Sequence, residues 1–442
     1  MAATAYSPAQ SFKKVTDQPT LAYRALLTFT ILYYARPEDF IPGLHYIPLN
    51  KISGGIALIG LFASLGTKDR PQIPMPVKVL IALLGQMMLA SIFAVWLGGA
   101  LDTTINKFSK GVIVAILISM IVVSVKQLRA LFFIQAASVA LVAVGSVLVN
   151  HGKFDRLYGI QHGILENPND LAINIAITFP LCVAFLLAAK GIFRKTLWLI
   201  GLVTMLYAVY ATYSRSGLIA MVVSGIICFW AYGIKGRRVG ILIGTGVLAL
   251  AAVGVVASST NYRARVESLF AGNVQDPGNS GSLEKRTYLL KESLRQAALH
   301  PVFGVGPGCF RTLTEGWQVA HNTYTEFAAE AGVLAVSLFL LALTGSFRNV
   351  KDLRKSPGYQ KDETVRLYTD AMWASLAAYV AGAAFSSTEY NLFAYFIMAY
   401  TCALYRIGFS PSFGAVETEV KKSKWTRLPE PKSETDKLAW TR

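Results

Sequence analysis

The sequence is poor in charged residues and in cysteine. Asp, Glu, Lys and Arg make up 15% of its 442 residues, whereas soluble domains carry about 25%. So little charge cannot cover the surface of an ordinary water-soluble protein of this length. The four cysteines, Cys182, Cys228, Cys309 and Cys402, form no CxxC pair and three of them lie in apolar runs, so the sequence gives no sign of a disulfide framework or a cysteine-based metal site.

The first residues also lack the pattern of a cleaved signal peptide. The N-terminus, MAATAYSPAQSFKK, is polar, and no small-residue cleavage site follows the first apolar run, Leu21 to Tyr34. We therefore expect this run to stay in the protein as a first membrane span.

Long hydrophobic runs dominate what is present. Hydrophobic residues make up 54% of the chain, and runs of low charge recur at the length of about 20 residues that spans a bilayer. The pattern predicts an all-α polytopic membrane protein of about twelve transmembrane helices, placed at 21–35, 53–66, 77–98, 111–125, 130–149, 171–189, 195–213, 216–234, 239–257, 325–345, 370–386 and 391–407.

The positive charge fits the same interpretation. A net charge of +17 could indicate nucleic-acid binding in a soluble protein, but here Lys and Arg lie mainly in short loops between apolar runs. With an inside N-terminus, the inner loops hold sixteen Lys and Arg and the short outer loops hold seven, as the positive-inside rule requires. We expect no nucleic-acid partner.

This topology divides the chain into five parts. We expect a cytoplasmic N-terminus at 1–20, spans 1–9 at 21–257, a large outer loop at 258–324 between spans 9 and 10, spans 10–12 at 325–407 and a basic cytoplasmic tail at 408–442. Within the large loop, SGSLEKRTYLLKESLRQAALHP has apolar residues at helical spacing and predicts a polar helix over the membrane domain.

Three polar segments fall on the predicted outer side. One is FDRLYGIQHGILENPNDLA, which contains Arg156, Asn167 and Asn169 and ends in good helix-initiating residues. The second is ATYSRSGLIA, with Arg215 in a tight turn between two apolar runs, where a charge is costly unless it is paired or lines a wet cavity. The third, FGVGPGCFRTLTEGWQVAHNTYTEF, places His321 directly before a span, and an imidazole can exchange a proton near neutral pH.

These segments resemble the O-antigen ligase and O-antigen polymerase superfamily. HNTYTEFAAEAG (321–332) is similar to the family's HNxxLxxxxxxG pattern, SRSGLI (214–219) to its RxxxL motif, and HPVFGVGPGCF (300–310) to its HPxxGxGxxxF signature. RLYGIQHGILENPNDLA resembles the outer-loop arginine followed by NPN. The resemblance covers about residues 150–400, and it departs from the family at Ile219 and at Thr325, where the family has leucine.

The resemblance implies an enzyme of the bacterial inner membrane, with its active site facing the periplasm. Such enzymes transfer a glycan from a polyprenyl-pyrophosphate carrier to a glycan, lipid or protein acceptor, with inversion and without a metal or other cofactor. Residues that could perform this chemistry are present, since guanidinium groups match phosphate oxygens and an imidazole can accept the proton of a hydroxyl. We expect catalytic roles for His321, Arg215 and Glu326, and substrate binding by Arg156, Asn167, Asn169, Arg286 and Asn322.

Other functions stay open at this point. Ligase and polymerase differ only in the acceptor, and the segment YYARPEDFIPGLHYIPL resembles ligase-like members, which favours a ligase. A dozen spans are also typical of secondary transporters, including bicarbonate carriers, but carriers place polar groups near the bilayer midplane and not at one surface. A glycosidase needs two carboxylates that flank the bond, whereas Glu326 and Glu330 share one helix face.

Overall fold

All of the regular secondary structure that the computed structural model describes is helical. It describes residues 20–37, 43–64, 72–150, 156–160, 165–238, 240, 280–314 and 318–410. The helices are α1 (Leu21–Ala35), α2 (Leu49–Ser64), α3 (Met75–Ile92), α4 (Leu97–Asp102), α5 (Ser109–Ile121), α6 (Val125–Asn150), α7 (Pro168–Ala188), α8 (Ile192–Ala211), α9 (Arg215–Cys228), α12 (Ser280–Leu299), α13 (Thr323–Leu353), α14 (Pro357–Lys361), α15 (Glu363–Ala383) and α16 (Leu392–Gly408). Two π-helical turns, Thr103–Phe108 and Phe229–Ile234, continue α4 and α9.

Seven of the described helices are long and apolar enough to cross a membrane. They cover Met75–Ile92, Leu97–Ile121, Val125–Asn150, Pro168–Ala188, Ile192–Ala211, Arg215–Ile234 and Thr323–Leu353, and three shorter apolar helices add Leu21–Ala35, Leu49–Ala63 and Leu392–Gly408. The polytopic all-α prediction is therefore confirmed, whereas the count of about twelve spans stays a prediction. The predicted span at 239–257 and the basic tail lie outside the described residues, apart from 240 and the first residues of the tail.

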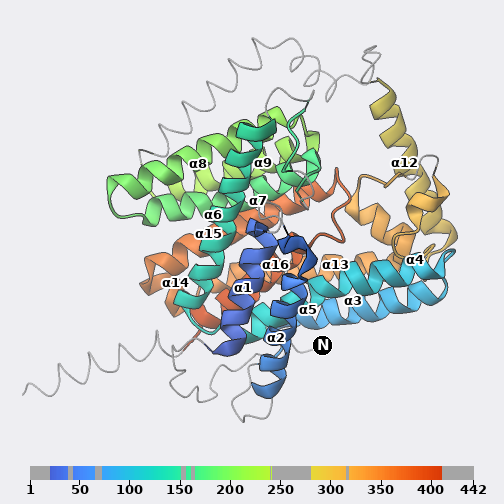
Figure 1. The fold of residues 1–442 in the computed structure, drawn as a ribbon, viewed down its shortest axis with the longest axis horizontal. Coiled ribbons are helices and arrows are strands. Elements are labelled where there is room, and N and C mark those ends of the chain that lie inside the picture. The colour runs from blue at the N-terminus through green and yellow to red at the C-terminus, as the bar shows by residue number, and fades with distance from the viewer. Residues whose placement is uncertain are drawn as a thin grey trace, which may run out of the picture.

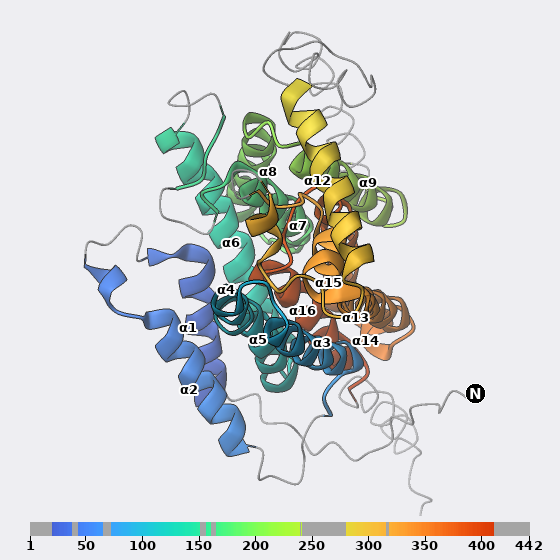
Figure 2. The same cartoon turned by 90° about the vertical axis from the view of Figure 1, so that its right-hand side faces the viewer.

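The helices pack into one bundle whose two ends differ. Figure 1 shows α3 and α13 running alongside each other, and α7 packs against α9 and α15. Figure 1 places α12 and α4 at one end of the bundle, its right-hand side, and α14 at the opposite end, and Figure 2 looks onto the end that carries α12 and α4. The polar helix predicted in the large loop is thus confirmed as α12, which packs against α13.

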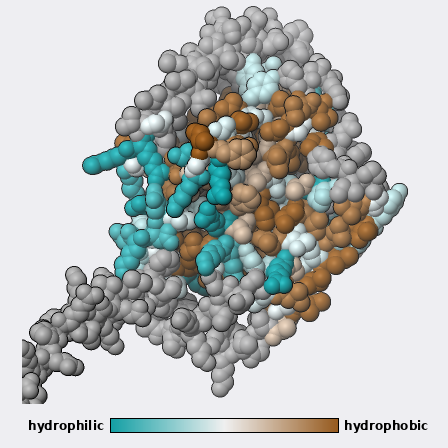
Figure 3. Space-filling model, turned by 60° about the vertical axis from the view of Figure 1, so that its left-hand side comes forward, coloured by the Kyte–Doolittle hydropathy of each residue, from teal (hydrophilic) through white to brown (hydrophobic). Residues whose placement is uncertain are grey.

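Large apolar side chains cover much of the outer surface. Leu148, Ile192 and Phe193 are at least 73% exposed, and Figure 3 shows hydrophobic side chains over a broad area of one face, with hydrophilic ones gathered toward one edge. An exposed apolar area of this extent is unfavourable in water but not against lipid chains. The surface supports a multi-pass membrane protein.

Helix ends bring the polar segments to one end of the bundle. The first residues of α7, α13 and α16 and the last residues of α1 and α15 line or adjoin a single cavity. At the opposite end, Arg354 pairs with Asp370 at 3.1 Å and Arg238 with Glu363 at 2.6 Å. Segments that are far apart in the sequence therefore meet where the candidate site lies.

Candidate functional site

A cavity of about 880 Å³ opens between the helix ends, and its lining is both apolar and charged. The apolar lining includes side chains from α1, α2 and α5, namely Phe29, Tyr33, Leu58, Ile113, Val114 and Leu117. The polar and charged lining includes His321, Asn167, Asn169, Asp170, Glu326, Glu330, Glu389, Arg36, Lys51, Lys107, Lys110 and Arg311. The cavity can therefore hold an amphipathic ligand with an anionic head.

His321 is positioned by the N-terminus of α13. Asn322 caps this helix, because its Oδ1 accepts hydrogen bonds from the amides of Tyr324 (3.0 Å) and Thr325 (3.2 Å). Its Nδ2 donates to the carbonyl of Ala384 at 3.0 Å, which ties the cap to the end of α15. His321 itself has a φ of 55°, a left-handed conformation that costs about 1 kcal/mol or more outside glycine. The left-handed backbone of His321 and the hydrogen bonds of Asn322 to α13 and to the end of α15 hold His321 in place.

The environment keeps this imidazole neutral. Burial, followed by the positive charges of Arg286 and Lys285, lowers the pKa of His321 to about 4. At pH 7 the ring is therefore uncharged and can accept a proton. The same two cations would stabilise an anion next to the ring.

Three arginines from separate segments lie near one another, and one of them, Arg286, lies near His321. Arg156 donates from Nε to the carbonyl of Thr212 at 2.8 Å and from Nη2 to Oδ1 of Asn169 at 3.1 Å. Arg215 is the first residue of α9, whose cap Ser214 accepts from the amide of Gly217 at 3.2 Å. Burial, together with the charges of Arg215 and Arg156, lowers the pKa of Arg286 on α12 below its usual range. Three like charges that repel one another in this way form a site prepared for an anion.

Replacing Arg286 with alanine is expected to raise the pKa of His321, because it removes a neighbouring positive charge. If His321 must be neutral to act, the acid limb of the pH dependence of the reaction rate will move to higher pH. Arg295→Ala is a matched control, since Arg295 lies on the same helix with a side chain that is 67% exposed. An unchanged acid limb in the Arg286 variant would show that the two groups are not coupled.

The loop 300–310 docks on a break in α13. Gly332 interrupts the helix with a φ of 85°, and the loop replaces the helical hydrogen bonds: the amide of Val305 donates to the carbonyl of Ala329 at 2.8 Å, and that of Gly306 donates to the carbonyl of Glu330 at 2.9 Å. Gly304, Gly306 and Gly308 also have positive φ angles, which glycine adopts without strain. These contacts explain why the two glycine-containing motifs occur together.

A Gly332→Ala substitution is expected to destabilise the protein by about 1–3 kcal/mol, because its φ is unfavourable for alanine. The added Cβ would also lie 2.3 Å from the carbonyl oxygen of Val302. Thermal unfolding in detergent measures the effect, with Gly85→Ala in α3 as the control, because a Cβ there meets no atom within 4 Å. Equal unfolding temperatures for the two variants would contradict this role of Gly332.

Thr325, which stands where the family has leucine, makes a hydrogen bond to α12. Its Oγ1 accepts a hydrogen bond from Ser293 Oγ of α12 at 2.9 Å. Thr325 is not among the described residues that line the cavity. A polar contact between α12 and α13 therefore takes the place of leucine packing, and the departure does not alter the described cavity wall.

Some of the residues expected from the sequence line the cavity, and the others do not. His321, Glu326, Asn167 and Asn169 line the cavity. Arg156, Arg215, Arg286 and Asn322 are not among its described lining residues, although Arg156 bonds to Asn169 and Asn322 directs His321. His162 lies outside the described residues. The roles assigned to the individual side chains stay predictions.

Several lining residues were not expected from the sequence. Arg36 follows the last residue of α1, and Lys51 lies in α2. Lys107 lies in the π-helical turn after α4, Lys110 in the first turn of α5, and Arg311 follows the docked loop. The segment YYARPEDFIPGLHYIPL carried a weak signal, since it contains Tyr33 and Arg36, which both line the cavity. Lys51, Lys107 and Lys110 resembled ordinary loop charges.

Comparison with known proteins supports one family. A family model described as O-Antigen ligase matches residues 200–340, a range that includes Arg215, the docked loop and His321. No curated protein matches the sequence. The matched range contains Arg215, Arg286, His321 and Glu326, and it confirms the resemblance seen in the motifs.

Proposed function

We propose that this chain, which belongs to the O-antigen ligase and O-antigen polymerase superfamily, transfers a glycan from a polyprenyl-pyrophosphate carrier to an acceptor hydroxyl at the periplasmic side of the inner membrane. The observation that carries the proposal is that Arg286 lies close enough to Arg156 and Arg215 for their charges to interact, and also near a neutral His321 that lines the cavity.

The arginines suit the leaving group. As the bond between the anomeric carbon and the pyrophosphate oxygen breaks, negative charge grows on the pyrophosphate. Fixed guanidinium groups stabilise that charge more in the transition state than in the ground state. Arg215 also begins α9, where the helix dipole adds a partial positive charge.

His321 suits the acceptor. The acceptor oxygen attacks the anomeric carbon from the side opposite the pyrophosphate, and its proton passes to the neutral imidazole. One carbon–oxygen bond forms as the other breaks, the configuration inverts, and polyprenyl pyrophosphate leaves with the bonding electrons. Glu326 lies one helical turn into α13 and accepts from the amide of Ala320 at 3.1 Å, so it would hold the chain that precedes His321. This displacement requires no metal.

The apolar lining of the cavity suits the carrier lipid. Phe29, Leu58 and Leu117 would contact the first isoprene units, and the rest of the chain would stay in the bilayer. Arg36 and Lys51 also line the cavity, and their positive charges would attract a phosphate head. A ligase is our first choice over a polymerase, because Tyr33 and Arg36 of the ligase-like segment line the cavity.

Reconstitution tests the proposal. Purified protein in liposomes, given a polyprenyl-pyrophosphate oligosaccharide and a lipid, protein or glycan acceptor, should release polyprenyl pyrophosphate and form the glycosylated acceptor. Which acceptor reacts separates ligase from polymerase. Uptake of a small solute such as bicarbonate without any lipid-linked sugar, and no transfer with any acceptor, would favour a transporter instead.

A further inference from the structure

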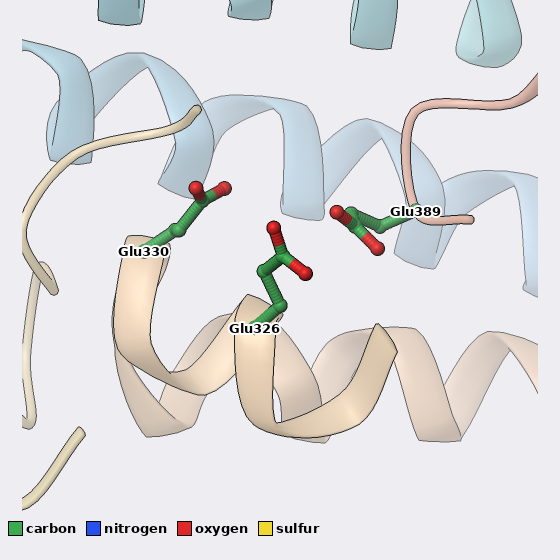
Figure 4. Close-up of side chains that lie close together, drawn as sticks. All are labelled: Glu326, Glu330 and Glu389. Carbon is green, nitrogen blue, oxygen red and sulfur yellow. The ribbon is translucent and has the colours of Figure 1, made fainter. Parts of the chain in front are cut away.

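Three carboxylates meet in the wall of the cavity. Glu326 and Glu330 project from α13 and Glu389 from the loop between α15 and α16, and each is at most 2% exposed. One oxygen of each lies within 4.8 Å of the other two. Figure 4 shows the three side chains turned toward a common space.

The protein's own donors satisfy these carboxylates unequally. Glu330 accepts from the amides of Gly308 (2.8 Å) and Phe310 (3.0 Å) and from the hydroxyl of Tyr390. Glu326 accepts from the amide of Ala320 and the hydroxyl of Ser387. The carboxylate of Glu389 accepts from Thr323 and from its own amide, but its Oε2 atom is buried and accepts no hydrogen bond from any described residue. A buried carboxylate oxygen without a partner is strongly unfavourable, so this atom points to a ligand.

The spacing and charge select the ligand class. Three oxygens within 4.8 Å of one another can all reach one Ca²⁺ ion at its usual ligand distance of about 2.3–2.6 Å. Ca²⁺ accepts such an irregular set of oxygen ligands, whereas Mg²⁺ requires near-ideal octahedral geometry and is seldom bound by an all-protein set of ligands. Arg311 lies near enough to Glu330 for their charges to attract. Against three carboxylates, that one arginine leaves an excess that a divalent cation would neutralise.

We propose that Glu326, Glu330 and Glu389 bind one Ca²⁺ ion at the wall of the cavity. All three line the cavity, so the ion can enter from it, and water or hydroxyl oxygens there can complete its coordination. The ion joins α13 to the loop 384–391, which also contacts the helix through the hydrogen bond from the amide of Thr323 to the carbonyl of Ser386 at 3.1 Å. It holds this wall in place, and the displacement step stays with His321 and the arginines.

Calcium titration of the full chain tests the proposal. The protein is purified in detergent, treated with a chelator and titrated with CaCl₂ by calorimetry, without any lipid-linked glycan. We expect saturable binding of one Ca²⁺ per chain, and Glu389→Gln is expected to weaken it by at least about tenfold. Glu363→Gln is the matched control, because that side chain is 62% exposed at the opposite end of the bundle. It should bind like the wild type.

Thermal unfolding shows whether a variant has lost calcium binding because its site is altered or because it no longer folds. Calcium should raise the unfolding temperature of the wild type and of Glu363→Gln, but not that of Glu389→Gln. Without calcium, Glu389→Gln should unfold no earlier than the wild type, because it removes a buried unpaired charge. If that variant does not fold, Glu389→Asp keeps the charge with a shorter reach and should bind calcium more weakly than the wild type.

Two results would overturn the proposal: no saturable calcium binding by the wild type, or unchanged binding in the Glu389 variants. Either would mean that protons neutralise the three carboxylates. Because no glycan donor is used, failure here leaves the transfer reaction untouched, and failure of transfer leaves the cation site untouched.

Discussion

Replacing His321 with alanine is expected to lower the rate of glycan transfer by about 10²–10⁴-fold, the usual contribution of a general base. The acceptor hydroxyl would then have no described imidazole near the arginine group to receive its proton. The measurement is release of polyprenyl pyrophosphate from a saturating donor, because donor binding by the arginines should persist. His321→Gln is the companion variant, since an amide keeps a polar group of similar reach but cannot act as a base at neutral pH.

The pH dependence supplies a second test of His321. Since burial and Arg286 lower the pKa of His321 to about 4, the wild-type rate should be level around pH 7 and fall only as the pH approaches that value. A bound pyrophosphate would raise this pKa through its negative charge, so the fall would begin at a higher pH with donor bound. Full turnover by His321→Ala would contradict its assignment as the base. So would a value of kcat/KM, which reports the pKa values of the free protein, that falls already between pH 7 and 6.

Replacing Arg215 with alanine is expected to reduce transfer by about 10²–10³-fold, comparable to the loss of one fixed donor that stabilises a developing anion. The effect should appear mainly in the turnover number, because Arg156 and Arg286 still attract the donor in the ground state. The same assay of polyprenyl pyrophosphate release measures it, together with the Michaelis constant for the donor.

Two further variants make this result specific. Arg215→Lys keeps the positive charge but loses the planar pair of donors, so it should recover only part of the activity. Arg348→Ala removes an arginine whose side chain is 82% exposed near the opposite end of the bundle and should transfer glycan like the wild type. Equal activity of Arg215→Ala and Arg348→Ala would remove Arg215 from the mechanism.

Much of the fold could be predicted because membrane spans depend on local composition. An apolar run of sufficient length predicts a helix wherever it lies in the sequence. The end of each run predicts where the chain reaches a surface of the membrane. The sequence predicts Arg156, Arg215 and His321 on one side of the membrane, and in the structure Arg286 lies near enough to each of the three for their charges to interact. The short helices α1 and α2 show its limit, since 15 or 16 residues do not determine whether a helix crosses the bilayer.

The rest of the site depends on contacts between distant residues. Glu389 lies 59 positions after Glu330, and only the packing of the loop 384–391 against α13 brings the two carboxylates together. Metal-ligand spacing within a short segment could not reveal that group. Gly332 likewise appeared as the last position of a motif, whereas its φ angle and the loop that fills the helix break are visible only in the structure.

A structure of the wild-type protein in a lipid nanodisc with bound polyprenyl pyrophosphate tests the central claim most directly. We expect the pyrophosphate in contact with Arg215 and Arg286, within reach of His321, and the start of the prenyl chain against Phe29 and Leu117. A pyrophosphate bound near α14, or one separated from His321 by the body of a helix, would contradict it.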